Sequence, residues 1–145
     1  MTQPSLPLSV TSPTPAVVNL GTCWGMPQGQ DLSSPSYMAT GFQCVGEAIA
    51  RRWSTSQGQL IDDPDYGLNV TDQIGNDLTP GEVAQMQQQL GAEAEKDERV
   101  VSCTCVVTFT NGALSVHAAV VTAAGPFKLV LGVSQVAPAT LLVTP

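Results

Sequence analysis

The chain has 145 residues and a formal net charge of −7, a length typical of one domain that buries a real core. Five basic residues against twelve acidic ones disfavour binding to nucleic acid or to anionic membranes, because both depend on lysine and arginine. Charged residues make up only 12% of the chain, about half the usual share, which indicates that partner proteins cover part of its surface.

Residues 1–35 are rich in Pro, Ser, Thr and Gln, and four prolines before position 16 forbid a regular helix. We predict an extended N-terminal arm whose apolar run Ala16–Leu20 could dock on another surface, with a disordered arm as the alternative. No secretory signal pattern is present, and no apolar run reaches the length of about 20 residues that crosses a bilayer. We therefore expect synthesis in a cytoplasm.

A first helix is predicted from about residue 39 to residue 53. Apolar residues recur there every four positions, at Val45, Ile49 and Trp53. The polar run that ends at Gly58 predicts a turn directly after this helix.

The next segment predicts mostly turns. Residues 59–61 favour a short strand or extended piece, and Pro64–Gly67 has the chemistry of a turn, with Pro fixing φ and Gly free to take a positive φ. Residues 68–74 suggest a short helix.

A second helix begins at the capping box Thr79–Glu82, with Pro80 at its first position, and runs to about residue 96. Its apolar stripe consists of Val83, Met86, Leu90 and Ala94.

After Arg99 the apolar period changes to two, which predicts three strands. Asn111-Gly112 is a strong hairpin signal, and Ala124-Gly125 marks a second turn. The expected core-facing residues are Val101, Cys103, Cys105, Val107, Phe109, Leu114, Val116, Ala118, Val120, Phe127, Leu129, Leu131 and Val133. The opposite face is also apolar, which is typical of a partner surface; its residues are Val106, Ala119, Val121 and Val130.

The last segment, residues 139–144, is β-prone and follows Pro138. We expect it to swing away and pair with a neighbouring protein, because Lys128 is the only charged residue after Val100 to protect a sheet edge. The alternative is that it folds back as a fourth strand.

The cysteines at positions 103 and 105 are expected on one face of a strand, which suits neither a mutual disulfide nor the usual zinc spacing. We interpret the four cysteines as small apolar residues.

These signals together predict an α+β fold, with two to three helices packed on an antiparallel meander of three to four strands. The predicted boundaries are an arm over 1–35, a domain over 36–138 and a C-terminal segment for strand pairing over 139–145.

The order of the signals resembles the baseplate wedge and sheath-initiator family of contractile phage tails and related injection systems, which also carries the label "lysozyme-like". The likeness covers about residues 48–136. The family's R-x-x-T-x-x-G segment and P-x-x-G turn are matched by Arg52, Thr55, Gly58, Pro64 and Gly67. Its Glu-Pro-Arg motif corresponds to Asp97, Glu98 and Arg99. Asp97 keeps the charge of the first residue and Arg99 is unchanged, whereas Glu98 stands where the family has Pro.

The resemblance implies a structural protein of the tail baseplate, in the virion, with no catalytic residue, metal or cofactor. Its partners would be the tail sheath protein and the other wedge and hub proteins of the baseplate. Several copies of the protein would form a ring, and we expect six. It would nucleate sheath assembly by strand addition. The predicted interface residues are Arg52, Asp97, Glu98, Arg99, Leu141, Leu142 and Val143.

Two other functions are open. A peptidoglycan-degrading glycosidase needs two carboxylates across a cleft, for which Glu47 with Asp63 or Asp65 is the candidate pair. A soluble cytoplasmic binding module is the second, and such a module would be monodisperse when expressed alone.

Two further sites are disfavoured. The acidic turn 62–65 contains Pro64 and lacks the downstream Glu of a calcium loop. His117, the only histidine, is expected opposite the core face without a nucleophile partner.

Overall fold

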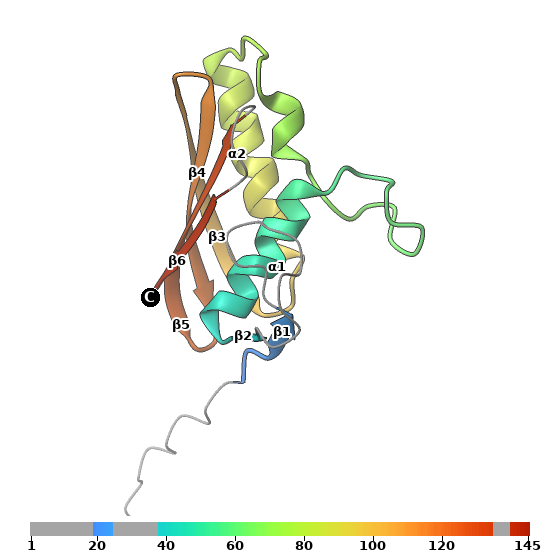
Figure 1. Ribbon diagram of the computed structural model, residues 1–145, viewed down its shortest axis with the longest axis vertical. Helices are drawn as coiled ribbons and strands as arrows, with labels where there is room; N and C mark the ends of the chain where they lie inside the picture. Colours follow the sequence, from blue (N-terminus) through green and yellow to red (C-terminus); the bar gives the residue numbers. More distant parts are fainter. Residues whose placement is uncertain (1–18, 25–37, 135–139) are drawn as a thin grey trace, which may run out of the picture.

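The computed structural model describes residues 19–24, 38–134 and 140–145. Its elements are β1 (Thr22–Trp24), β2 (Met38–Thr40), α1 (Phe42–Ser54), the 3-10 helix η2 (Val70–Gln73), α2 (Pro80–Glu95), β3 (Val100–Thr110), β4 (Ala113–Thr122), β5 (Gly125–Ser134) and β6 (Thr140–Thr144). Figure 1 shows two layers, with α1 and α2 on one face of the large sheet. The predicted α+β fold is confirmed.

The large sheet is antiparallel throughout, with strand order β3-β4-β5-β6. Asn111 and Gly112 join β3 to β4 and both have positive φ values, 50° and 76°, as a type I′ turn requires. The hairpin predicted at this dipeptide is therefore confirmed.

The alternation along the strands buries one face as expected, with two exceptions. A register shift between Val100 and Ser102 turns Val101 outward, where it is 67% exposed, and puts Val100 in the core. Phe109, next to the end of β3, is 45% exposed. The predicted outer residues Val106 and Val121 are indeed exposed, so the outer face is apolar.

The second helix begins as its sequence requires, and both helices pack on the core. The first helix begins at Phe42 rather than at the expected residue 39, because Met38–Thr40 forms β2 and pairs with β1. The side chain of Thr79 accepts the backbone N–H of Glu82, and the Glu82 carboxylate accepts the N–H of Thr79, which confirms the capping box. Trp53 is fully buried between the helices, and its indole N–H donates to the Leu90 carbonyl at 3.1 Å. This bond satisfies the one polar group of a large core side chain.

The segment between the helices is mostly loop. Residues 59–61 form no strand, and Ile61 is 94% exposed. The predicted short helix over 68–74 is only η2, which the Asn69 side chain caps.

The cysteines at positions 23, 44, 103 and 105 are all free, and the last three are buried. The Sγ atoms of Cys103 and Cys105 lie 3.7 Å apart on one face of β3. Their interpretation as small apolar residues fits this placement.

Part of the predicted N-terminal arm belongs to the folded domain, so the boundary after residue 35 needs correction. Leu20 is 5% exposed within the hydrophobic core, and β1 pairs with β2 in a second, two-stranded sheet. The N–H of Gly41 also donates to the Gly21 carbonyl. Residues 1–18 and 25–35 of the predicted arm lie outside the described residues.

The C-terminal segment is the fourth strand of its own sheet, so the expectation that it swings away is wrong for this structure, as is a boundary at 139. Residues 140–144 pair with β5 along their whole length. Leu141 and Val143 pack against the core, whereas Leu142 is 59% exposed on the outer face. Burial of two apolar side chains against α1 and β5 favours this position over a free segment.

Gly46 in α1 makes room for β6. A Cβ atom at this position would come within 2.6 Å of a Val143 methyl group and 3.3 Å of a Leu129 methyl group. We expect Gly46→Ala to lower the free energy of unfolding by about 1 kcal/mol by displacing β6, although Ala is the better helix former.

Gly81 in α2 is the matched control, because a Cβ there meets nothing within 4 Å. Gly81→Ala should leave stability unchanged or raise it slightly. Urea unfolding of both variants tests the idea, and a Gly46→Ala protein as stable as Gly81→Ala would contradict it.

Candidate functional site

Four of the seven predicted interface residues line one shallow depression in the surface. Arg52 comes from the end of α1, and Asp97, Glu98 and Arg99 come from the turn between α2 and β3. The described lining is completed by Asn19, Leu20, Gly21 and Lys96, and the volume is about 600 Å³. Motifs that are about 45 residues apart in the sequence thus meet in space.

Asp97 and Arg99 form a two-pronged ion pair. The Arg99 Nε and Nη2 atoms donate to the two Asp97 carboxylate oxygens at 2.9 and 2.7 Å. Asp97 Oδ1 also accepts the backbone N–H of Arg99 at 3.0 Å, which makes an Asx turn with Glu98 at its centre. The carboxylate that Arg99 binds thus belongs to its own chain.

Arg99 also ties the N-terminal segment to the domain. Its Nη1 atom donates to the Leu20 carbonyl at 3.0 Å and lies 3.4 Å from the Cys44 Sγ atom. One guanidinium group therefore connects the turn before β3 to a segment 79 residues away in the sequence. Only Arg has a fork of donors that can serve a carboxylate and a carbonyl together.

The ion pair changes the acidity of both partners. Hydrogen bonds from the Arg99 side chain hold the pKa of Asp97 below its ordinary value, against the opposing effect of burial. The same contact raises the pKa of Arg99. Both groups are therefore charged at every physiological pH.

Glu98 and Lys96 give the depression its accessible charges. Glu98 is exposed and makes no hydrogen bond or ion pair with the part of the chain that the structure describes. The Lys96 ammonium group is bound to Glu93 at 2.7 Å and to the Asp65 carbonyl at 3.1 Å. Glu98 is thus the residue of the motif best placed to meet a partner.

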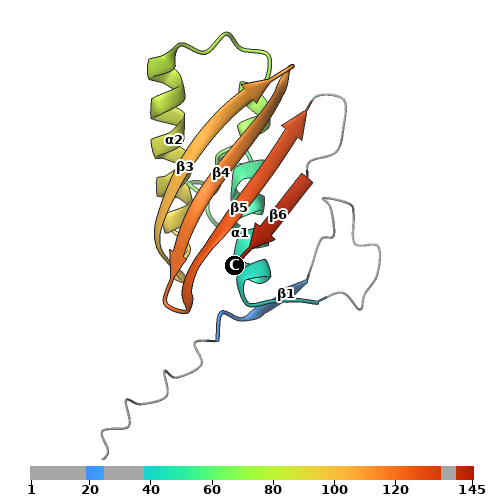
Figure 2. The same ribbon diagram turned by 90° about the vertical axis from the view of Figure 1, so that its left-hand side faces the viewer.

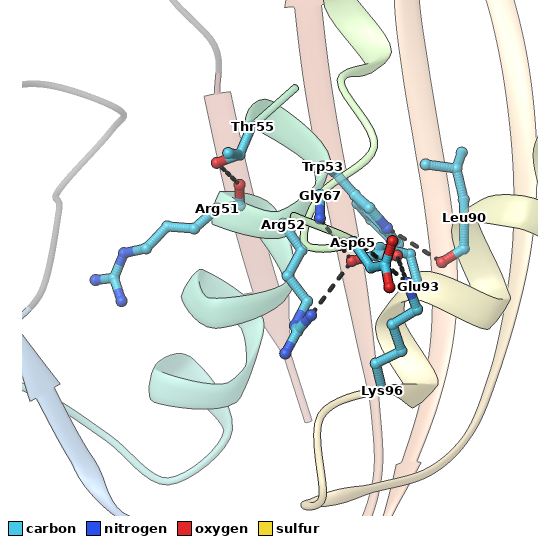
Figure 3. A network of polar contacts seen from close by, with 9 residues as sticks. All are labelled: Arg51, Arg52, Trp53, Thr55, Asp65, Gly67, Leu90, Glu93 and Lys96. Atoms are coloured by element: carbon cyan, nitrogen blue, oxygen red, sulfur yellow. Dashed lines mark hydrogen bonds and ion pairs between the residues drawn. The ribbon is translucent and has the colours of Figure 1, made fainter. Parts of the chain in front are cut away.

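Arg52 pairs with Glu93, which is not among the predicted interface residues (Figure 3). Its Nη1 atom lies 3.2 Å from Glu93 Oε1. The guanidinium group also stacks over the Tyr66 ring at 4.4 Å. Glu93 is only 4% exposed, and it also accepts the backbone N–H of Gly67 at 2.8 Å. A single carboxylate thus joins α1, α2 and the loop between them.

The neighbours of Glu93 stabilise its charged form. Burial by itself would raise its pKa, but hydrogen bonds from Lys96 and Gly67 and the contact with Arg52 outweigh burial and leave the pKa lowered. A signal was present in the sequence, because Glu93 and Asp97 continue the apolar stripe of Met86 and Leu90 at helical spacing. An acid on a buried stripe needs a cationic or N–H partner.

The other three predicted interface residues lie elsewhere. Leu141, Leu142 and Val143 belong to β6, at the edge of the sheet, and do not line the depression. The prediction therefore describes two separate surfaces.

The residues proposed for other functions are not assembled into a recognisable site. Glu47 is buried, accepts a hydrogen bond from Gln43 at 2.9 Å and lies 3.8 Å from Arg51. Asp63 and Asp65 are exposed on the loop after α1. Over the described ranges, no group of three or more His, Cys, Asp or Glu residues is arranged to hold a metal ion.

The lowered pKa values of Asp97 and Glu93 predict acid sensitivity. Because both groups titrate lower in the folded protein than in the unfolded chain, their stabilising effect is present above the ordinary values of 3.8 and 4.5 and is lost as the pH falls toward the folded values. We expect the urea midpoint to fall below about pH 5, and Asp97→Asn to lower the midpoint at pH 7 while flattening this pH dependence. If the urea midpoint of Asp97→Asn falls with pH as steeply as that of the wild type, Asp97 does not contribute to the acid sensitivity.

No helix in the described residues has the length and apolar character needed to span a membrane. No protein-family model matches this chain, and a search of curated proteins finds no significant match.

Proposed function

We propose that this protein is a structural component of a contractile tail baseplate, which links wedge proteins to the first sheath ring and nucleates sheath assembly by strand addition. The observation that carries the proposal is the meeting of Arg52 with the Asp97–Arg99 motif in one depression. These are the matched residues by which the sequence resembles the baseplate wedge and sheath-initiator family.

The depression suits a contact with a wedge protein. The Asp97–Arg99 pair fixes the turn, and this leaves the exposed Glu98 on a rigid base. A preorganised charged group of this kind favours one partner orientation at little entropic cost.

The edge strand β6 suits a contact with the sheath. An edge strand offers unpaired N–H and C=O groups to a strand of another protein. The five residues of β6 carry no charge, and Leu142 is exposed beside Val130 on the apolar outer face. The incoming strand would pair with the outer edge of β6, and β6 would stay paired with β5.

A structural role is favoured over hydrolysis. A retaining or inverting glycosidase needs two carboxylates facing each other across a cleft. Glu47 is engaged within α1, whereas Asp63 and Asp65 are exposed on a loop. We therefore expect the protein to act by binding alone. The resemblance further implies several copies in a ring.

Leu142→Lys tests the sheath contact. The residue is 59% exposed, so the isolated variant should fold with unchanged stability, while a charge at this position should oppose an added strand. We expect baseplates that contain the variant but lack ordered sheath, as measured by electron microscopy of particles. Thr110→Lys, which is also exposed on the sheet, is the control. Normal sheath on Leu142→Lys particles would argue against the proposal.

A further inference from the structure

The two edges of the four-stranded sheet have different surroundings. The edge strands are β3 and β6. Figure 2 shows α2 alongside β3, at the opposite end of the sheet from β6. Since an unprotected edge is a template for another strand, the contacts of each edge determine where the sheet can be extended.

Side chains of α2 accept hydrogen bonds from backbone N–H groups of β3. The N–H of Val107 donates to Gln87 Oε1 at 2.9 Å, and the N–H of Cys103 donates to Glu95 Oε1 at 3.1 Å. Residues four apart in a strand direct their N–H groups to the same side. These two amides therefore lie on the side of β3 that faces away from β4.

The spacing of helix and strand makes this pairing possible. Gln87 and Glu95 are two turns apart, about 12 Å along the helix axis. Cys103 and Val107 are about 13 Å apart along an extended strand. The helix thus runs along the edge in register with alternate N–H groups.

Gly91, halfway between the two acceptors, lets the helix approach this closely. A Cβ atom there would lie 2.9 Å from the Cys103 carbonyl oxygen. Gln87, Gly91 and Glu95 are four residues apart and so share one face of α2. This face is built to contact a strand backbone.

The β6 edge lacks such a cover in the part of the chain that the structure describes. No described side chain donates to or accepts from the backbone of β6, and the strand itself is uncharged. We propose that Gln87 and Glu95 close the β3 edge between Cys103 and Val107, so that, of the two edges of the described sheet, β6 is the one that another protein extends. The identity of the added strand rests on the proposed function, whereas the closure of β3 is a property of the isolated protein.

Amide hydrogen exchange of the full chain tests the closure. In the double variant Gln87→Ala/Glu95→Ala, exchange at Cys103 and Val107 should become about tenfold faster, because each amide loses its acceptor. The variant Gln87→Glu/Glu95→Gln keeps an acceptor at both positions and should retain protection. Gln85→Ala should retain it as well, because the exposed Gln85 lies on the side of α2 toward η2 and not toward β3. Equal exchange in the wild type and the double Ala variant would overturn the proposal.

Self-association then tests the consequence for partner choice. With its β3 edge open, the double Ala variant should form concentration-dependent dimers in excess of the wild type by light scattering. Adding Leu142→Lys, at the other edge, should leave these dimers intact. A double Ala variant no more associated than the wild type would overturn the proposal, as would dimers that Leu142→Lys abolishes. Neither result depends on sheath assembly, so both can be separated from failure of the baseplate role.

Discussion

Replacing Glu93 with Ala is expected to lower the free energy of unfolding by about 4 kcal/mol, because it leaves a largely buried cation and a buried N–H without their acceptor. The Arg52 side chain is 16% exposed and the Gly67 amide is buried, so water can replace Glu93 only in part. The loop after α1 should loosen as well, since its end at Gly67 is fixed by this contact. Urea unfolding and exchange of the Gly67 amide measure the two effects.

Two controls separate the buried network from charge alone. Glu98→Ala removes an exposed acid from the same region and should change stability by less than about 0.5 kcal/mol. In a double-mutant cycle, the double variant Arg52→Ala/Glu93→Ala should lose less free energy of unfolding than the two single variants together. The reason is that the double variant leaves neither charged side chain without its partner. Additive effects, or a Glu93→Ala protein as stable as Glu98→Ala, would refute the role assigned to Glu93.

Replacing Arg99 with Ala is expected to cost about 3 kcal/mol, since Asp97 is only 8% exposed and loses both of its side-chain donors. The change also removes the bond to the Leu20 carbonyl. We therefore expect faster amide exchange in residues 19–24 together with a lower urea midpoint.

Arg99→Lys and Lys128→Ala are the matched variants. Lys keeps the charge but cannot serve two carboxylate oxygens and a carbonyl together, so Arg99→Lys should lose part of the stability. Lys128 is exposed on β5, and its removal should have little effect. If Arg99→Ala is no more destabilising than Lys128→Ala, Arg99 is only a solvated charge at a helix end.

The elements that the sequence predicted well are those specified by neighbouring residues. The capping box at Thr79 and Glu82 closes within one turn of helix, and Asn111-Gly112 needs only its own positive φ values. The alternation along β3 to β5 separates the two faces of the sheet, because successive side chains point to opposite sides. Its failure at Val101 came from a bulge, which the apolar pattern does not reveal.

The tertiary structure decided the contacts that cross the chain. Residue types identified Asp97 and Arg99 as a motif, but only the fold brings Arg99 to Leu20 and Arg52 to Glu93. The residue type alone does not distinguish a buried glutamate from an exposed one. Their difference arises from partners that are 26 and 41 residues away in the case of Glu93.

The C-terminal segment shows the same limit. Its composition identified a strand, yet a strand can pair with any edge that offers N–H and C=O groups. In the structure α2 covers the edge of β3, and Gly46 leaves space beside β5. These two contacts determine that the segment pairs with β5. The sequence by itself thus determined the capped helix and the three-stranded meander, because capping, turn chemistry and propensity act locally. The structure decided the small β1–β2 sheet and which edges and charges meet, because these depend on packing between distant segments.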